Sequence, residues 1–325
     1  GISGSGKSSL VSQALVELVA RCLGRQAPVD VDDDDLHDAH DAPEIPTGGA
    51  IASGMTSIKR LERVDQRPIG RTPRSNLATY TGLFDDVRKL FASTKMARAR
   101  RYDAGRFSFN VAKGRCEHCE GEGFVMVELL FMPSVYAPCP TCQGTRYNEK
   151  TLEVRYREMN IAEVLQLTVR DAADFFADAA RIRRSLDVLN EVGLGYLRLG
   201  QPATELSGGE AQRIKLATEL QRMERGNTLY VLDEPTTGLH PSDVDRLLKQ
   251  LHRLVDAGNT VVVVEHEIRV VADSDWVIDI GPGAGEEGGT IVAAGPPTEV
   301  AKAKRSRTAP YLARALRREH HRSAA

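Results

Sequence analysis

The sequence predicts an α/β fold in which a phosphate-binding core with a parallel sheet is split by a long insertion that carries a metal module. Three observations lead to this prediction. A complete phosphate-loop pattern occupies Gly1–Ser8. Two apolar runs of strand length, Leu229–Leu232 and Val261–Val264, flank a helical pattern and are each followed by polar residues. Four cysteines between these parts read C-x2-C-x19-C-x2-C, a spacing typical of structural zinc sites.

Length and composition narrow the class of protein. At 325 residues the chain can form one large domain or two to three smaller ones. No apolar run approaches the roughly 20 residues of a membrane span, and the first residues do not read as a signal peptide. Five cysteines, four of them in close pairs, favour a bound metal in a reducing cytoplasm over disulfides. We expect the fifth, Cys22, to be a buried thiol, because it follows the apolar residues of a helical pattern.

The phosphate loop fits G-x4-G-K-[ST] in full. Its glycines let backbone N–H groups approach phosphate oxygens, Lys7 reaches the β- and γ-phosphates, and the Ser8 hydroxyl ligates Mg²⁺. The predicted helix Ser9–Leu23 would direct its N-terminal dipole at the phosphates. Because such loops normally follow a strand, we expect a strand before Gly1 in a longer protein. The residues expected to bind the nucleotide here are Gly1, Gly4, Ser5, Gly6, Lys7, Ser8 and Ser9.

The two apolar runs, with the helical pattern Ser242–Ala257 between them, predict a β-α-β unit whose strands are buried on both faces. Ligands bind beyond the carboxyl ends of strands in such sheets. Asp233, Glu234 and His266 fall there. We expect Asp233 to hold Mg²⁺ and Glu234 to polarise the attacking water. His266 would position that water and sense the γ-phosphate, although a histidine after a strand can also be purely structural.

A further helix is predicted to open at Leu206–Gln212, with Ser207 as its N-cap. The run LSGGEAQRIKLATEL is similar to the ABC-ATPase signature, LDEPTTGLH resembles the Walker B and D-loop run, and VVEH resembles the switch-histidine region. The resemblance implies an ABC-type P-loop ATPase core, split by a helical signature subdomain that carries the four-cysteine zinc module. In that family ATP lies between two domains, so Ser207, Gly208 and Gly209 would serve a partner domain's nucleotide. A capped helix after a loop is the alternative.

The insertion points to one branch of this superfamily. Segments 63–76, 78–82, 105–110 and 193–202 resemble the second nucleotide-binding half of UvrA, the damage-recognition ATPase of bacterial nucleotide excision repair. The resemblance runs from Gly1 to about Val300. It makes Gln66 a Q-loop glutamine whose amide reaches Mg²⁺ or the attacking water.

The resemblance also implies a domain organisation. Residues 1–65 and 206–300 would form the two parts of the ATP-binding core, and 66–205 the Q-loop and signature subdomain. The zinc module would lie at about 106–150. A basic tail over 301–325 would be helical across Tyr311–Arg318.

The same resemblance implies a cytoplasmic, ATP-dependent sensor of DNA damage that belongs to the SOS response and is not itself a nuclease. Its cofactors would be ATP, Mg²⁺ and Zn²⁺. Its partners would be damaged double-stranded DNA, a UvrB-like helicase, the N-terminal ABC half of the same protein and a second copy in a homodimer, with no membrane. Departures from the family pattern at Arg67, Leu77 and Glu267–Arg269 leave open a UvrA-like paralogue that gives resistance to DNA-binding drugs or partners an exporter. A zinc-stabilised DNA-binding module with an inert ATPase is a second alternative.

The four cysteines Cys116, Cys119, Cys139 and Cys142 favour a closed tetrahedral Zn²⁺ site with a structural role. The strand-like segment Phe124–Met132 would form a hairpin between the two pairs. His118 would face solvent, and we expect Phe107 to belong to the core.

A basic region precedes and overlaps the module. Between Lys59 and Arg115 the sequence has 15 Lys/Arg and 5 Asp/Glu, which suits a polyanion, although a solvated charged face is the alternative. The arginines expected to contact DNA are Arg71, Arg74, Arg98, Arg100, Arg101, Arg106 and Arg115. The acidic segment Asp30–Asp41, with seven aspartates, is predicted to be a surface loop that repels DNA.

Overall fold

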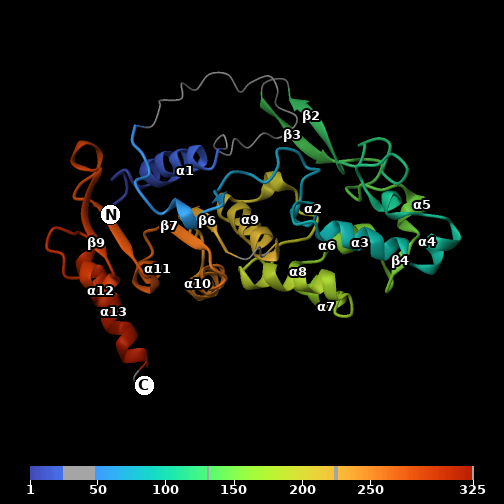
Figure 1. Ribbon diagram of the computed structural model, residues 1–325. Coiled ribbons are helices and arrows are strands. Elements are labelled where there is room, and N and C mark those ends of the chain that lie inside the picture. The colour runs from blue at the N-terminus through green and yellow to red at the C-terminus, as the bar shows by residue number, and fades with distance from the viewer. Residues whose placement is uncertain (25–47, 130–131, 223–225, 324–325) are drawn as a thin grey trace. The chain divides into compact units, whose positions relative to one another are not determined.

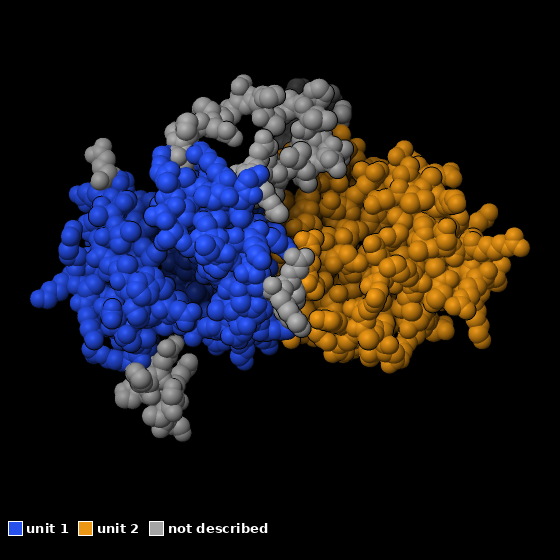
Figure 2. All heavy atoms as spheres, in the orientation of Figure 1, with its two compact units in different colours: residues 1–65, 224–325 blue, residues 66–223 orange. Residues whose placement is uncertain are grey.

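The computed structural model describes residues 1–24, 48–129, 132–222 and 226–323, and it divides into two compact units (Figures 1 and 2). Unit 1 comprises Gly1–Asp65 and Glu224–Ala325, and unit 2 comprises Gln66–Met223. The chain thus leaves unit 1 and returns to it, so unit 2 is an insertion. The acidic segment 30–41 lies outside the described residues.

The centre of unit 1 is a parallel sheet of β1 (Arg60–Val64), β6 (Thr228–Asp233) and β7 (Thr260–Val264), in that order. Leu61 lies opposite Leu229, and Asp233 lies opposite Val264. Helix α10 (Pro241–Asp256) connects β6 to β7. The predicted β-α-β unit is therefore confirmed, but its strands are not equally buried: β6 is buried over Thr228–Leu232, whereas Val261–Val263 of β7 are half-buried.

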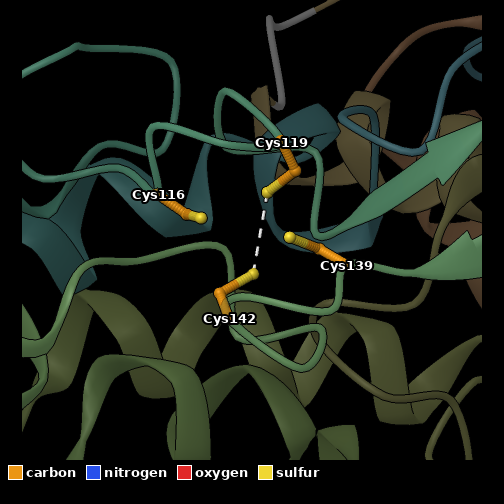
Figure 3. Close-up of side chains that lie close together, drawn as sticks. All are labelled: Cys116, Cys119, Cys139 and Cys142. Atoms are coloured by element: carbon orange, nitrogen blue, oxygen red, sulfur yellow. Dashed lines mark hydrogen bonds between the residues drawn. The ribbon is translucent and has the colours of Figure 1, made fainter.

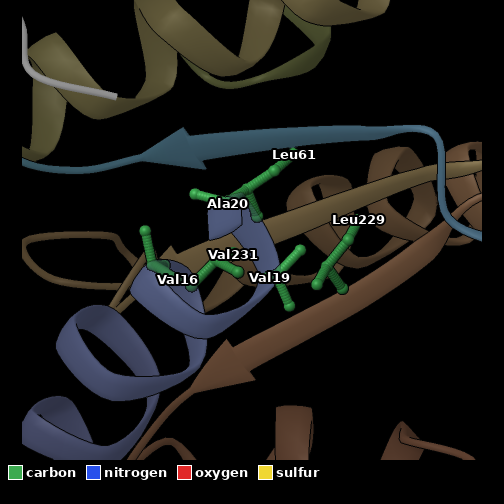
Figure 4. Packing of buried hydrophobic residues seen from close by; sticks show 6 residues of the cluster. All are labelled: Val16, Val19, Ala20, Leu61, Leu229 and Val231. Carbon is green, nitrogen blue, oxygen red and sulfur yellow. The ribbon is translucent and has the colours of Figure 1, made fainter. Parts of the chain in front are cut away.

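The helical segment after the phosphate loop packs on this sheet. It begins as a π-helical stretch, Ser9–Leu15, and continues as α1, Val16–Cys22. Figure 4 shows the resulting cluster, which consists of Val16, Val19, Ala20, Leu61, Leu229 and Val231. The prediction that Cys22 is buried is wrong, since its side chain is exposed. The buried stripe follows helical spacing through positions 16, 19 and 20, and Cys22 lies off that stripe.

The rest of unit 1 follows β7 (Figure 1). Strands β8 and β9 form an antiparallel hairpin. The helix predicted within the C-terminal tail is confirmed by α13, and the tail is partly packed, because Leu312 is buried in a cluster with Val277 and Val300. The elements are α11 (Ile268–Asp273), β8 (Val277–Gly281), β9 (Thr290–Gly295), α12 (Pro297–Val300) and α13 (Ala309–Ser323), with 3-10 turns at Met55–Ser57 and Gly285–Glu287.

Unit 2 is mainly helical and has an aromatic core. Phe84 stacks on Phe109 with ring centroids 5.2 Å apart, and Phe91 contacts Phe107 at 5.6 Å. The prediction that Phe107 is a core residue is confirmed by its full burial. The helices are α2 (Leu77–Tyr80), α3 (Leu83–Ala92), α4 (Lys95–Ala99), α5 (Glu149–Leu152), α6 (Ile161–Gln166), α7 (Val169–Phe175), α8 (Ala180–Glu191) and α9 (Gly208–Arg222), with 3-10 turns at Ala104–Phe107 and Ala203–Glu205.

Two short hairpins complete unit 2. Strands β2 (Phe124–Leu129) and β3 (Met132–Pro138) pair antiparallel between the cysteine pairs, and β4 (Arg155–Tyr156) pairs with β5 (Met159–Asn160). The hairpin predicted between the cysteine pairs is confirmed, with the expected strand divided between β2 and the start of β3. Within the described ranges, no helix is both long and apolar enough to span a membrane.

Candidate functional site

The phosphate loop has the open backbone that its sequence predicts. Gly4 and Gly6 adopt φ of 76° and 90°, a region that side-chain-bearing residues rarely enter. Lys7 folds back across the loop, and its Nζ donates to the carbonyl O of Ile2 at 2.6 Å. Partial burial lowers the pKa of Lys7, against the opposing effect of the Glu234, Asp279 and Asp233 carboxylates. An ammonium and an open glycine loop at a helix N-terminus suit an anion.

A second glycine-rich segment, Gly281–Gly289, supports the loop from the other side. Its N–H groups donate to the loop carbonyls: Gly285 to Gly4 O at 3.2 Å, and Gly289 to Ser5 O at 2.9 Å. A Cβ on Gly288 would lie 3.2 Å from the Cα of Ser5, so this close approach favours glycine. Sequence reasoning missed this contact, and the only signal for it was the run of glycines after β8.

Asp233, at the end of β6, is held by two hydroxyls. Ser8 Oγ donates to Asp233 Oδ1 at 3.2 Å, and Ser12 Oγ donates to Asp233 Oδ2 at 3.1 Å. Ser8 and Ser12 are four residues apart and so lie on one side of the helical segment. The structure therefore brings together Ser8 and Asp233, two of the three residues predicted to reach Mg²⁺. It adds Ser12, which sequence reasoning missed although its spacing from Ser8 was a signal.

Glu234 and His266 meet beyond the carboxyl ends of β6 and β7. His266 Nε2 lies 3.3 Å from Glu234 Oε1. The Glu234 N–H donates to Val264 O at 2.8 Å, which extends the parallel ladder, and its φ is 46°. Glu265 links the two loops: its carboxylate accepts from the N–H groups of Thr236 and His266, both at 2.8 Å. The predicted pair is thus in contact, and Glu265 is a further residue that supports it.

The signature segment and Gln66 belong to unit 2 and are described with it. Ser207 and Glu210 form a capping box: Ser207 Oγ accepts from the Glu210 N–H at 3.3 Å, and Glu210 Oε2 accepts from the Ser207 N–H at 2.7 Å. Tyr196 Oη also donates to Glu210, at 2.6 Å. A Cβ on Gly208 would lie 3.1 Å from the Gln66 carbonyl O, so Gln66 packs closely on the signature glycines. The N-cap predicted at Ser207 is confirmed.

The four cysteine thiols converge where two short turns, the knuckles 116–119 and 139–142, meet at the open end of the β2–β3 hairpin (Figure 3). Their sulfur atoms all lie within 4.8 Å of one another, as a tetrahedral thiolate site requires. The Gly123 N–H donates to Cys119 Sγ at 3.3 Å, which matches the expectation that knuckle glycines direct N–H groups at sulfur. His118 is exposed, as predicted.

Two of the four thiols, Cys119 and Cys139, differ in acidity. Burial raises the pKa of Cys119 to about 12. Burial also disfavours the Cys139 thiolate, but N–H donors from Cys142 and Thr141 outweigh it and lower its pKa to about 7. Four closely spaced sulfurs suit a divalent cation, since a cation stabilises thiolates that would otherwise repel each other.

The arginines predicted to contact DNA fall into two groups. The first group is held by protein partners. Arg74 pairs with Glu122 at 3.5 Å, Arg115 with Glu120 at 3.1 Å, and Arg100 with Glu153. Arg106 donates to Thr151 Oγ1 at 2.9 Å and lies over the Tyr102 ring. The second group is Arg98 and Arg101, which are exposed near the end of α4, and Arg71 is also exposed.

Comparisons with known proteins agree with this geometry. No protein-family model matches the chain. The UvrABC system protein A of Streptococcus pyogenes is 54% identical over 312 residues, which cover 96% of this chain and 31% of that protein. The corresponding protein of Lactiplantibacillus plantarum is 51% identical over 324 residues, covering 100% of this chain and 32% of that protein.

Among solved structures, UvrA2 from Deinococcus radiodurans is similar at a TM-score of 0.86 and 66% identity, covering 97% of this chain and 36% of that one. The chain spans about a third of the length of the curated relatives that it matches. The predicted fold class, an ABC-type P-loop ATPase core with a helical insertion and a cysteine module, is thereby confirmed. On the identity along its whole length and the fold that it shares, the chain belongs to the UvrA family.

Proposed function

We propose that this chain is the C-terminal nucleotide-binding half of a UvrA-like protein that recognises damaged DNA in nucleotide excision repair and loads a UvrB-like helicase. The observation that carries the proposal is the arrangement in unit 1. There the phosphate loop, the Ser8–Asp233 contact and the Glu234–His266 contact share the carboxyl-terminal side of one parallel sheet.

Each residue of this arrangement would have a separate role in ATP hydrolysis. Bound Mg²⁺–ATP would supply the phosphoanhydride bond whose cleavage drives the conformational cycle. Lys7 and the glycine N–H groups would hold anionic oxygens, while Ser8 and Asp233 offer the hard oxygen ligands that Mg²⁺ prefers. Glu234 would accept a proton from water, and His266, 3.3 Å away, would orient its carboxylate.

A complete site would need a second nucleotide domain. In ABC ATPases the signature of one domain faces the phosphate loop of another, so Ser207–Gly209 would complete a site on the N-terminal half or on a second copy. The Ser207–Glu210 capping box leaves the glycine N–H groups at the start of α9 available to an anion. Gln66 packs against Gly208, and as the Q-loop glutamine its amide would reach Mg²⁺ or the attacking water.

Lys7 and Glu234 provide the test of this assignment. Lys7→Ala should abolish binding of a fluorescent ATP analogue to the chain, whereas Glu234→Gln should leave binding intact. In a protein that includes the partner nucleotide domain, Glu234→Gln should lower turnover by about 10²–10⁴-fold, the usual contribution of a general base. Turnover that survives Glu234→Gln would refute the role of this carboxylate, and binding that survives Lys7→Ala would refute the phosphate site.

DNA binding is proposed for the basic surface of unit 2, with the exposed arginines as the main contacts. Arg98 and Arg101, at and just beyond the end of α4, are exposed to solvent. Each phosphate contact lowers the slope of log K against log salt by about 0.9. The double substitution of Arg98 and Arg101 to Ala should therefore flatten the slope by about 1.8 in an anisotropy titration.

The matched control is the pair Arg74 and Arg115, which already contact Glu120 and Glu122. Their double substitution to Ala should change the slope less, because these arginines are engaged with protein carboxylates. A slope that the Arg98 and Arg101 substitutions leave unchanged would place these two residues away from DNA.

A zinc ion is proposed at the four cysteines with a structural role, because four thiolates leave no open position for catalysis. Metal analysis of the purified chain should give one zinc per chain. Substituting Cys139 and Cys142 with Ser should remove it. A metal content near zero in the wild-type chain would overturn this assignment.

A UvrA-like paralogue is the second candidate function. Identity to the Deinococcus radiodurans UvrA2 is 66%, against 51% and 54% for the two curated relatives above, which favours it. Binding to purified UvrB discriminates the two candidates. Capture of UvrB by the protein on damaged DNA supports the repair subunit, whereas binding to drug-modified DNA without UvrB supports the paralogue.

A further inference from the structure

Arg146, which follows the second cysteine pair, is a charged residue in the interior of unit 2. Only 4% of its surface is exposed, and its φ is 72°. Its Nη2 donates to the carbonyl O of Pro73 at 2.8 Å and lies 3.5 Å from that of Gly200. Its guanidinium lies 5.0 Å from the centre of the Phe109 ring. A buried guanidinium is retained only where it has partners of this kind.

The backbone of Arg146 ties together the two cysteine pairs. Its carbonyl O accepts from the Cys116 N–H at 2.9 Å, and its backbone N–H favours the thiolate form of Cys142. A Cβ on Gly123 would lie 2.9 Å from Arg146 Cγ, so the side chain passes directly over the glycine whose N–H bonds to Cys119. Arg146 therefore touches both knuckles through main chain and side chain.

The charge balance of the module also involves this side chain. Desolvation lowers the pKa of Arg146, while Tyr147, Cys119, Cys142 and Glu122 favour its charged form. Four thiolates around a divalent cation carry a net charge of −2, which a buried site must offset. Buried Nη1 has no hydrogen-bond acceptor among the described atoms. A nearby anionic metal–thiolate centre would supply the compensating charge.

The two loops that Arg146 contacts are joined to each other and lead to the signature motif. Asn76 forms an antiparallel bridge with Pro202, and the Ala203 N–H donates to Ser75 O at 2.8 Å. Ser207 follows four residues after Ala203. A displacement at Pro73 or Gly200 would therefore be transmitted along a short, hydrogen-bonded path.

We propose that Arg146 is a positioning residue that serves as the buried counter-charge of the metal–thiolate centre and couples its occupancy to the loops 70–76 and 197–203. Zinc would order these loops through Arg146, and loss of zinc would release them. This inference rests on the zinc site proposed above. Metal analysis of the wild-type chain separates failure of the zinc site from failure of the Arg146 coupling. A chain without zinc contradicts the zinc site, whereas a zinc-loaded chain allows the coupling to be measured.

The test compares Arg146→Met, Arg146→Lys and Arg88→Met. Arg88 also places a guanidinium over an aromatic ring, 5.9 Å from the Phe84 centroid, and controls for lost packing. Zinc release to a chromophoric chelator should be about 10–100-fold faster in Arg146→Met, the usual effect of removing a residue that supports metal ligands. Arg146→Lys, which keeps the charge, should restore most of the retention, and Arg88→Met should match the wild type.

Hydrogen exchange provides a second readout, and its first comparison uses only the wild-type chain, with and without zinc. Chelation of zinc from the wild-type chain should raise deuterium uptake in the loops 70–76 and 197–203 as well as in the module. In Arg146→Lys, which lacks the planar fork that reaches Pro73 and Gly200, uptake in these loops should be high before chelation and change little after it. The proposal is overturned if Arg146→Met retains zinc like the wild type, or if wild-type loops do not respond to chelation.

Discussion

Substituting Ser12 with Ala tests whether the Asp233 carboxylate is held ready for a metal ion. Ser12 is buried, with 5% of its surface exposed, and its Oγ donates to Asp233 Oδ2 at 3.1 Å. Ser8 donates to the other carboxylate oxygen at 3.2 Å. Removing the Ser12 hydroxyl leaves Asp233 with more rotational freedom but changes neither of the two proposed Mg²⁺ ligands.

The magnitude follows from the strength of a hydrogen bond to a charged group, about 1.5–3 kcal/mol when well shielded. Asp233 is half-exposed, so water replaces part of what is lost, and we expect about 1 kcal/mol. A tenfold change in affinity corresponds to about 1.4 kcal/mol, so this loss weakens Mg²⁺–ATP binding by about fivefold. Binding of ATP without Mg²⁺ should hardly change, because Asp233 then has no cation to hold.

The assay is a fluorescence titration with an ATP analogue, in Mg²⁺ and in EDTA. Ser12→Thr keeps the hydroxyl and should bind like the wild type, and Gln13→Ala, at the next and exposed position, controls for changes in the helix. Equal affinity of Ser12→Ala and wild type in Mg²⁺ would refute the reasoning. An equal loss in Mg²⁺ and EDTA would refute it too, since the effect would then not involve the cation.

Three further predictions concern unit 2. Stripping the metal with a chelator under reducing conditions should make the β2–β3 hairpin sensitive to protease, because ligation energy in such modules is folding energy, and an unchanged digestion pattern would contradict this. Tyr147→Phe should lower the free energy of unfolding by about 1–3 kcal/mol, because the buried hydroxyl donates to Phe107 O at 2.8 Å. Denaturant unfolding measures this loss, and a loss below about 0.5 kcal/mol would contradict a stabilising role for the hydrogen bond. Burial disfavours ionised Glu210, but hydrogen bonds from Tyr196 and Ser207 outweigh it and lower its pKa below 4.5, so its stabilisation is present above pH 4.5 and is lost as pH falls through the lowered pKa. Glu210→Gln should therefore lose less stability than wild type as the pH falls from about 4.5 through the lowered pKa, and equal losses would exclude this role.

Local sequence patterns predicted the parts of the site that local geometry builds. The phosphate loop, the β-α-β unit and the Ser207 cap depend on residues a few positions apart, and so do the two cysteine pairs. The cysteines meet as expected because one pair precedes β2 and the other follows β3, and the antiparallel register places both at the open end of the hairpin.

What the sequence could not predict depends on residues far apart in the chain. Arg74 contacts Glu120 and Glu122, so counting charges between Lys59 and Arg115 missed carboxylates just beyond that range. Arg146 reads as one more basic residue after a knuckle, and only the fold places it beside Pro73 and Gly200. The prediction that Cys22 is buried was wrong because the apolar residues before it do not determine which side of the helix it occupies.

The backbone at Glu234 explains why the loops after β6 and β7 form one connected element. A left-handed conformation at a residue with a side chain is unfavourable and persists only where the surroundings enforce it. Here the Glu234 N–H is fixed by Val264 O, and Glu265, which follows Val264, accepts from Thr236 and His266. Each loop is therefore hydrogen-bonded to the other, and a movement of His266 must change the position of Glu234. A single displacement after β7 would therefore make or break the contact between Glu234 and His266.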